Sequence, residues 1–285
     1  MVDKNVMTIN NPIRKLRYKL EIFTDSSLTG WGAVCNGVTA HGWWNLEQQK
    51  LHNHSLELLA AFYGLKCFVK DLSSCEVLLR IDNTTAIAYI NRMGSIQYPK
   101  LTKLCKEIWQ WCEERQLWIF AYYIKSCDNS IADKESRVLP NETEWEKSFE
   151  GFREIQKAFG FFQIDLFASN NNKKCVRFVS WKQDPEAFAI DAFTLNWASY
   201  KFYAFPPFSL ILKSLRKIIA DKAHWVLVVP FWPTQPWFPL FKSLLVDDLI
   251  YLGPDNELLL CPFRKNHPLA KNLILAVGKL SGGRI

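Results

Sequence analysis

The chain has 285 residues, of which 49% are hydrophobic and 14% aromatic. This apolar content excludes an intrinsically disordered protein and predicts one large domain or two of ordinary size. The formal net charge of +7 is a mild bias toward polyanionic partners.

The cysteines and the N-terminus predict an intracellular protein. The eight cysteines form no CxxC pair and no Cys/His cluster, so we expect reduced thiols and no structural zinc. Residues 1–17 form a polar, basic extension without the apolar core of a signal peptide. Because no apolar run is long enough to cross a bilayer, we expect a soluble protein of the cytoplasm or nucleus with no membrane partner.

Residues 18–138 predict a first α/β domain. Residues 18–44 alternate apolar and polar residues around glycine-bearing turns, which favours three short strands. Helical spacing follows over residues 55–70, with Ser55 as the expected N-cap. The remaining expected elements are a buried strand (EVLLRID), a helix after it, a helix over about 98–115, a strand (LWIFAYYI) and a helix opening at NSIADKESR.

The second half predicts a helical linker and a second domain. Residues 139–158 are charged and have helical spacing, which favours a linker. Residues 159–285 show a second α/β pattern, for which we expect a Rossmann-like, doubly wound fold. Its expected elements are a strand at QIDLFAS, one near KFYAFPP, a helix from Ser209 to about Ala220 and a strand at HWVLVVP.

Four carboxylates occupy distinctive places in the first domain. Asp25 and Asp82 end predicted strands, Glu57 lies in the first predicted helix, and Asp133 lies in the opening turn of the last one. Charged groups at the ends of apolar strands are costly to bury unless they are paired or bind metal. Because hard cations prefer oxygen ligands, the pattern predicts a site for two Mg²⁺ or Mn²⁺ ions.

Each carboxylate also has a purely structural interpretation. Asp25 could be a turn residue, and Glu57 could be a helix N-terminal charge. Asp82 could belong to a helix cap, and Ser130 with Asp133 matches a capping box. The joint order of strand end, helix, strand end and helix start favours the shared metal site.

The motifs TDSSLTGWGAV, SLELLA, IDNTTAIAYIN and NSIADKESR resemble the ribonuclease H domain of DIRS-type retrotransposon polyproteins. The resemblance implies a mixed five-stranded sheet with flanking helices, with Asp25, Glu57, Asp82 and Asp133 as catalytic metal ligands. It also implies cleavage of the RNA strand of RNA–DNA hybrids, beside an upstream reverse transcriptase domain. Two features depart from many cellular relatives: residues 124–129 contain no histidine, and residues 91–98 are too short for a basic substrate-gripping insertion.

Two alternative functions stay open at the level of sequence. A transposase or integrase uses the same fold with three carboxylates; Glu57 and the absence of a Cys/His module favour the nuclease. An inactive, retroelement-derived nucleic-acid-binding remnant is the other, and the presence of all four carboxylates favours an active enzyme.

The second domain resembles the segment that follows the nuclease in the same elements, which is similar to phage-type adenine N6-methyltransferases. The resemblance implies that Asp165 lies near S-adenosylmethionine and that Phe205-Pro206-Pro207-Phe208 forms the loop that holds the target amine. Phe205 stands where the family places a side-chain oxygen, and no glycine-rich loop follows Asp165. Asp191 is the candidate to supply the missing oxygen if it reaches the loop. We expect a retained fold without methyl transfer.

Overall fold

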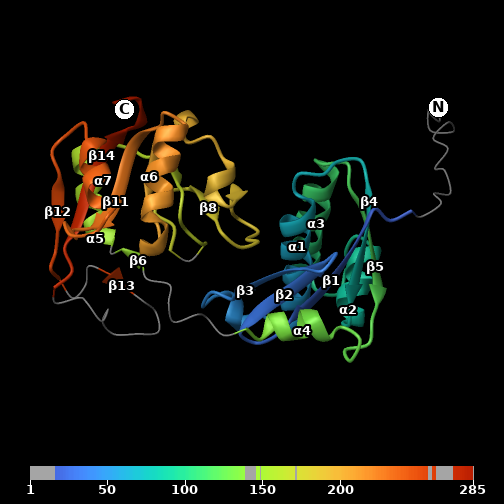
Figure 1. Cartoon of the computed structure of the whole chain (residues 1–285). Helices are drawn as coiled ribbons and strands as arrows, with labels where there is room; N and C mark the ends of the chain where they lie inside the picture. The colour runs from blue at the N-terminus through green and yellow to red at the C-terminus, as the bar shows by residue number, and fades with distance from the viewer. Residues whose placement is uncertain are drawn as a thin grey trace, which may run out of the picture. The chain divides into compact units, whose positions relative to one another are not determined.

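The computed structural model describes residues 17–138, 146–147, 149–170, 172–255, 259–260 and 272–284. Contacts between residues divide the chain into two compact units, residues 1–137 and 138–285, both visible in Figure 1. In the described ranges, no helix is both long and apolar enough to cross a membrane.

The first unit is a five-stranded sheet with helices on both faces. Its strands are β1 (Leu20–Ser26), β2 (Gly30–Cys35), β3 (Val38–Trp43), β4 (Glu76–Ile81) and β5 (Trp118–Tyr123). Its α-helices are α1 (Asn53–Val69), α2 (Thr84–Asn91), α3 (Pro99–Glu113) and α4 (Ser130–Ser136), and a short 3-10 helix covers Gln48–Lys50. The sheet order is β3-β2-β1-β4-β5, with β2 antiparallel to both neighbours and β1, β4 and β5 parallel. The predicted mixed five-stranded sheet with flanking helices is confirmed.

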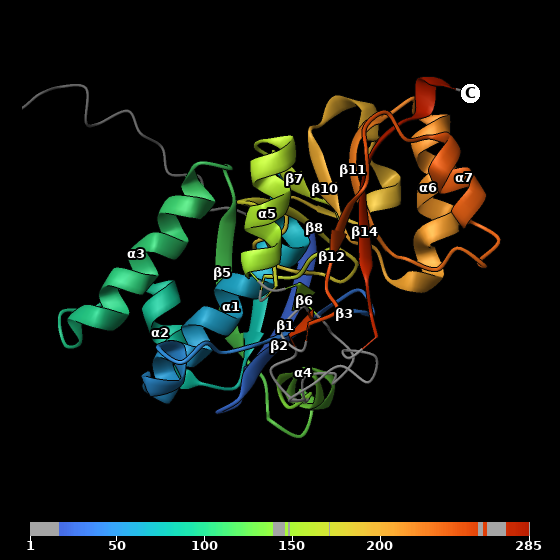
Figure 2. The same ribbon diagram turned by 90° about the vertical axis from the view of Figure 1, so that its left-hand side faces the viewer.

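Close packing on β2 shows why its two faces carry different helices. A Cβ added to Gly32 would lie 2.3 Å from the carbonyl oxygen of Ala132 in α4. A Cβ added to Gly64 of α1 would lie 3.3 Å from the Cβ of Ala33. Because neighbouring strand residues point to opposite faces, α1 packs on one face and α4 on the other (Figures 1 and 2).

The second unit is a seven-stranded sheet in the order β12-β14-β11-β10-β7-β8-β9. These strands are β7 (Ile164–Asp165), β8 (Arg177–Ser180), β9 (Ala189–Ile190), β10 (Phe202–Ala204), β11 (His224–Pro230), β12 (Ile250–Leu252) and β14 (Leu275–Ser281). Strands β7 to β11 are parallel, and β14 is antiparallel to β11 and β12. The α-helices are α5 (Phe149–Phe159), α6 (Ile211–Ala220) and α7 (Phe238–Ser243). The minor elements are a two-stranded sheet of β6 (Glu146–Lys147) and β13 (Leu259–Leu260) and 3-10 helices at Ala192–Thr194, Trp197–Ser199, Phe208–Leu210 and Gly282–Arg284.

Helices cover both faces of the seven-stranded sheet. Phe152 and Ile155 of α5 belong to one buried cluster, and Leu215 of α6 and Phe241 of α7 belong to another. Figure 2 shows α5 on one side of the sheet and α6 and α7 on the other. A second α/β domain is therefore present, as predicted. The expected linker over 139–158 differs from the structure in one respect: α5 buries its apolar side chains in this core and so belongs to the second unit.

Candidate metal site and the site of the second unit

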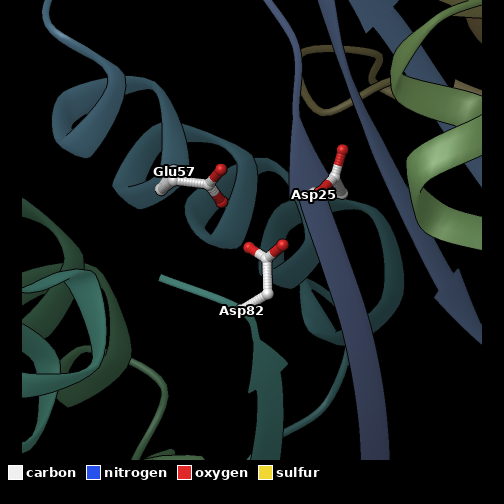
Figure 3. A group of neighbouring side chains, drawn as sticks. All are labelled: Asp25, Glu57 and Asp82. Carbon is white, nitrogen blue, oxygen red and sulfur yellow. The ribbon is translucent and has the colours of Figure 1, made fainter. Parts of the chain in front are cut away.

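Three of the four predicted carboxylates converge. One oxygen each from Asp25, Glu57 and Asp82 lies within 4.8 Å of the others, and Figure 3 shows the side chains pointing toward one another. Asp25 and Glu57 are only 5% and 3% exposed, whereas Asp82 is half-buried. Such a group of acidic oxygens is a ligand set that a hard divalent cation prefers.

The sheet topology explains why these side chains meet. Strands β1 and β4 are parallel neighbours, with Ile22 opposite Leu79, so their carboxyl ends reach the same edge. Asp25 lies at the end of β1, and Asp82 follows β4 directly. The close approach of Gly64 to β1 then brings α1, and with it Glu57, over this edge.

The local structure argues against the structural interpretations of two carboxylates. Helix α1 begins at Asn53 and not at the expected Ser55, so Glu57 lies beyond the first turn. A negative charge gains most from the helix dipole within the first turn, so this interaction does not explain Glu57. Asn83 caps α2 by accepting a hydrogen bond from the Ala86 N–H at 3.0 Å. Asp82 is therefore not the cap, and both carboxylates are left for another role.

Burial and mutual repulsion disfavour the ionised forms of two carboxylates. The pKa of Glu57 is raised to about 8, mainly by desolvation and also by the charges of Asp25 and Asp82, although hydrogen bonds from Ser26 lower it. Desolvation also raises the pKa of Asp25 to about 6, with the charges of Asp82 and Asp133 acting in the same direction. A cation between these groups would remove the repulsion.

Unsatisfied oxygens show that the residues fit such a cation. Asp25 Oδ2 and Glu57 Oε2 are buried without a hydrogen-bond partner, although buried polar atoms are almost always paired. The other Glu57 oxygen accepts from the Ser26 hydroxyl at 2.8 Å, and Asp82 Oδ2 accepts from Ser126 at 2.7 Å. Each hydroxyl fixes its carboxylate and leaves the second oxygen available for a metal ion.

Asp133 differs from the other three. It is not a member of the group within 4.8 Å, and its carboxylate accepts from Arg137 Nε at 3.0 Å and Nη2 at 2.7 Å. Its charge nevertheless contributes to the raised pKa of Asp25, so it lies close enough to act on the site. The N-cap position of α4 is Asn129, so the capping box of Ser130 and Asp133 that was the structural alternative does not form. A role for Asp133 as a metal ligand remains a prediction.

Three residues that the sequence analysis missed attach α4 to this edge of the sheet. The Ser27 hydroxyl donates to the carbonyl oxygen of Ser136 at 2.6 Å, and the Asn129 amide donates to the carbonyl oxygen of Thr24 at 2.9 Å. His41 of β3 contacts Glu135 at 2.6 Å. The short polar residues beside Asp25 were the one sequence signal for these contacts. The contacts join residues about a hundred positions apart, so the local sequence pattern does not reveal them.

The predicted site residues of the second unit lie on both sides of a topological switch point. Chain progression runs from β7 toward β9 on one side and from β10 toward β12 on the other. Asp165 ends β7, and Pro206 and Pro207 follow its neighbour β10. The carboxyl ends of strands at such a point are where ligands bind in open α/β sheets.

Asp165 accepts hydrogen bonds from the loop that follows β7. It is 2% exposed, and its two oxygens accept from the backbone N–H groups of Phe167 at 3.3 Å and Lys174 at 3.0 Å. Burial raises its pKa to about 6. The described residues between β7 and β8 contain no helix, so no helix N-terminus faces a ligand here. These contacts explain Asp165 without a cofactor.

The loop of residues 205–208 carries an aromatic ring at the position where the resemblance places a side-chain oxygen. Phe205 and Phe208 form a ring pair 6.3 Å apart, and Phe208 also contacts Trp232 at 5.1 Å. Asp191 follows β9, which is separated from β10 by β8 and β7. Three strand intervals correspond to about 14 Å, and the Asp191 side chain accepts from the Phe193 N–H at 3.0 Å. Asp191 therefore does not replace the missing oxygen in this conformation.

The sequence profile of the family described as DNA N-6-adenine-methyltransferase (Dam) matches residues 136–254. A Dam methyltransferase-like domain thus occupies the second unit, and it includes α5, in agreement with the packing of that helix. No curated protein matches the chain significantly.

Solved RNase H structures match the N-terminal region of the chain, and a retroviral protease-reverse transcriptase matches part of it. LC11-RNase H1, crystallised with an RNA/DNA hybrid, is 19% identical, with 41% of this chain and 93% of that one covered and a TM-score of 0.34. RNase H1 from the halophilic archaeon Halobacterium salinarum is 13% identical. The match covers 41% of this chain and 92% of that one, with a TM-score of 0.34. The protease-reverse transcriptase of prototype foamy virus is 15% identical. The match covers 45% of this chain and 22% of that one, with a TM-score of 0.29.

Proposed function

We propose that the first unit is a divalent-metal-dependent ribonuclease H. The observation that carries this proposal is the convergence of Asp25, Glu57 and Asp82 within 4.8 Å, with buried, unpaired oxygens on the first two. A divalent ion held there supplies a Lewis acid and activates water for phosphodiester cleavage.

The protein's own groups prepare the site. Ser26 and Ser126 orient Glu57 and Asp82, and the surrounding core keeps Asp25 and Glu57 away from water. Fixed geometry of this kind lowers the cost of bringing water and phosphate together. Asp133 is paired with Arg137 and its side chain is 41% exposed; its predicted role as a ligand would require it to join the site when substrate and metal are bound.

The proposed substrate is an RNA–DNA hybrid, and the proposed context is a retroelement polyprotein with a reverse transcriptase. Support comes from the ribonuclease H motifs in the sequence together with a methyltransferase-like domain that follows them. A transposase-like strand transferase is the alternative activity, and a strand-transfer assay with DNA ends distinguishes it.

Hybrid cleavage is the test. With Mg²⁺, the full chain is expected to cut the RNA strand of a hybrid internally and to leave a DNA duplex of the same sequence intact, because the 2′-hydroxyl distinguishes the two strands. Activity is expected to fall steeply with salt, since phosphate contacts dominate affinity. Gel analysis of end-labelled strands measures both. Equal cleavage of hybrid and DNA duplex would refute the substrate assignment.

We also infer that the second unit does not transfer methyl groups to adenine. Pro206 offers a backbone oxygen to the amine, but Phe205 offers none, and loss of one orienting hydrogen bond costs about 10²–10³ in rate. A radiolabel assay on DNA is expected to show no incorporation, and calorimetry reports whether S-adenosylmethionine binds at all. Tight cofactor binding with label at adenine would show this inference to be wrong.

A further inference from the structure

Cations and aromatic rings alternate along one edge of the seven-stranded sheet. Because β7 to β11 are parallel, the residues that begin these strands share an edge, opposite the edge that carries Asp165 and Pro206. We call the following residues the amino-edge band: Phe161, Arg177, Phe188, Lys201, Trp225 and Lys279.

The strand register fixes the order of the band. Phe188 precedes β9, Arg177 begins β8, and Lys201 precedes β10. Trp225 lies at the start of β11, where the neighbouring β14 brings Lys279 beside it. From β9 to β11 the band crosses four strand intervals, about 19 Å. A stacked strand with one phosphate every 3.4 Å would place about five phosphates over this length.

The rings and cations of the band are paired with each other. Arg177 lies 5.4 Å from the ring centre of Phe188, and Lys201 lies 5.3 Å from that of Trp225. Phe161, two residues before Gln163, is 72% exposed, and Phe188 is 43% exposed. The Lys201 N–H donates to the Gln163 side chain at 2.9 Å, which links the positions of Phe161 and Lys201.

Arg177, Lys201 and Lys279 contribute three positive charges to the band. Lys279 forms an ion pair with Asp247 at 3.4 Å, and the Asp247 side chain is itself 53% exposed. The pKa of nearby His224 is lowered, mainly by burial and also by the charge of Lys279, while the charge of Asp247 acts in the opposite direction. Arg177 and Lys201 are exposed and lie over rings.

We propose that the amino-edge band binds single-stranded nucleic acid without sequence preference. Alternating cations and exposed rings suit a flexible strand, since cations follow the phosphates and unpaired bases stack on ring faces. A duplex hides its base faces from such rings. The proposal does not depend on the nuclease activity or on methyl transfer. Through the shared chain, such binding would raise the local concentration of nucleic acid for the first unit.

Fluorescence anisotropy of a labelled oligothymidylate tests the proposal, with the full chain in EDTA over a range of salt concentrations. Phe161→Ala with Phe188→Ala is expected to weaken binding by about tenfold or more for each ring that stacks on a base. Arg177→Gln with Lys201→Gln is expected to reduce the slope of log affinity against log salt by about 0.7 for each charge.

Matched controls come from the same unit. Trp181 is 69% exposed but follows the carboxyl end of β8, and Lys242 is exposed on α7. Trp181→Ala and Lys242→Gln are expected to leave affinity and salt slope unchanged. The proposal is overturned if the wild type does not bind, or if both band variants bind like wild type. The charge variants change exposed side chains only, so they remain informative if the double alanine variant is unstable.

Discussion

Asp25→Asn is expected to reduce hybrid cleavage by about 10³-fold or more. A bound metal ion contributes several kcal/mol to transition-state stabilisation, and about 1.4 kcal/mol corresponds to tenfold in rate. Asp25 belongs to the group of three carboxylates and carries a buried, unpaired oxygen. Single-turnover cleavage at saturating Mg²⁺ measures the loss.

The same assay separates Asp133 from the group of three. Asp133 is held by Arg137 outside the 4.8 Å group, so Asp133→Asn is expected to cost only about 10–100-fold, as supporting residues of metal sites do. Asp128→Asn, which alters an exposed carboxylate between β5 and α4, is the control and is expected to cleave normally. Similar losses for Asp128→Asn and Asp25→Asn would contradict this account.

Without metal, stability is expected to fall as the pH rises from about 4 to about 8. The folded-state pKa values of Asp25 and Glu57, about 6 and about 8, lie above their ordinary values. The folded protein therefore binds more protons than the unfolded chain in this window. The stabilising contribution is complete below about pH 4 and is lost as the pH passes the folded-state values.

Glu57→Gln isolates the larger contribution. At pH 7 in EDTA the amide is expected to raise the free energy of unfolding by up to about 3 kcal/mol, since one pKa unit corresponds to about 1.4 kcal/mol. Mg²⁺ is expected to reverse the ranking, because it binds the charged carboxylate of the wild type. Thermal melting with and without Mg²⁺ measures both effects.

The control for this substitution is Glu47→Gln. Glu47 is an exposed glutamate paired with Lys50, with a side chain that is 82% exposed, so its removal is expected to leave the melting temperature unchanged. A metal-free wild type that becomes more stable between pH 5 and pH 8, together with a destabilised Glu57→Gln, would show that burial and repulsion of the two carboxylates do not destabilise the fold.

The strand-end carboxylates could be predicted from sequence because alternation of apolar residues locates strand ends. Asp25 and Asp82 follow such runs directly. The sequence predicts the start of α1 at Ser55, yet the His52 side chain accepts a hydrogen bond from the His54 N–H and caps a helix that starts earlier. Histidine is not among the preferred caps, so this start had no reliable signal.

The contacts of Asp133 and the packing of α5 show what local pattern leaves open. Arg137 lies four residues after Asp133, a spacing at which helical ion pairs form, but the sequence alone does not decide between an ion pair and a metal ligand. Phe152 and Ile155 are three residues apart on one helix face. Their partners in this core come from β10, β11, β12 and β14, all distant in the sequence, so the local pattern does not show that the helix is buried there.

The most direct measurement of the central claim is a crystal structure of the protein soaked in Mn²⁺, with an anomalous difference map. We expect a peak at the edge of β1 and β4, with oxygens of Asp25, Glu57 and Asp82 at metal–ligand distances of about 2.0–2.3 Å, and no such peak in Asp25→Asn. A wild-type map without manganese among these three carboxylates would contradict it.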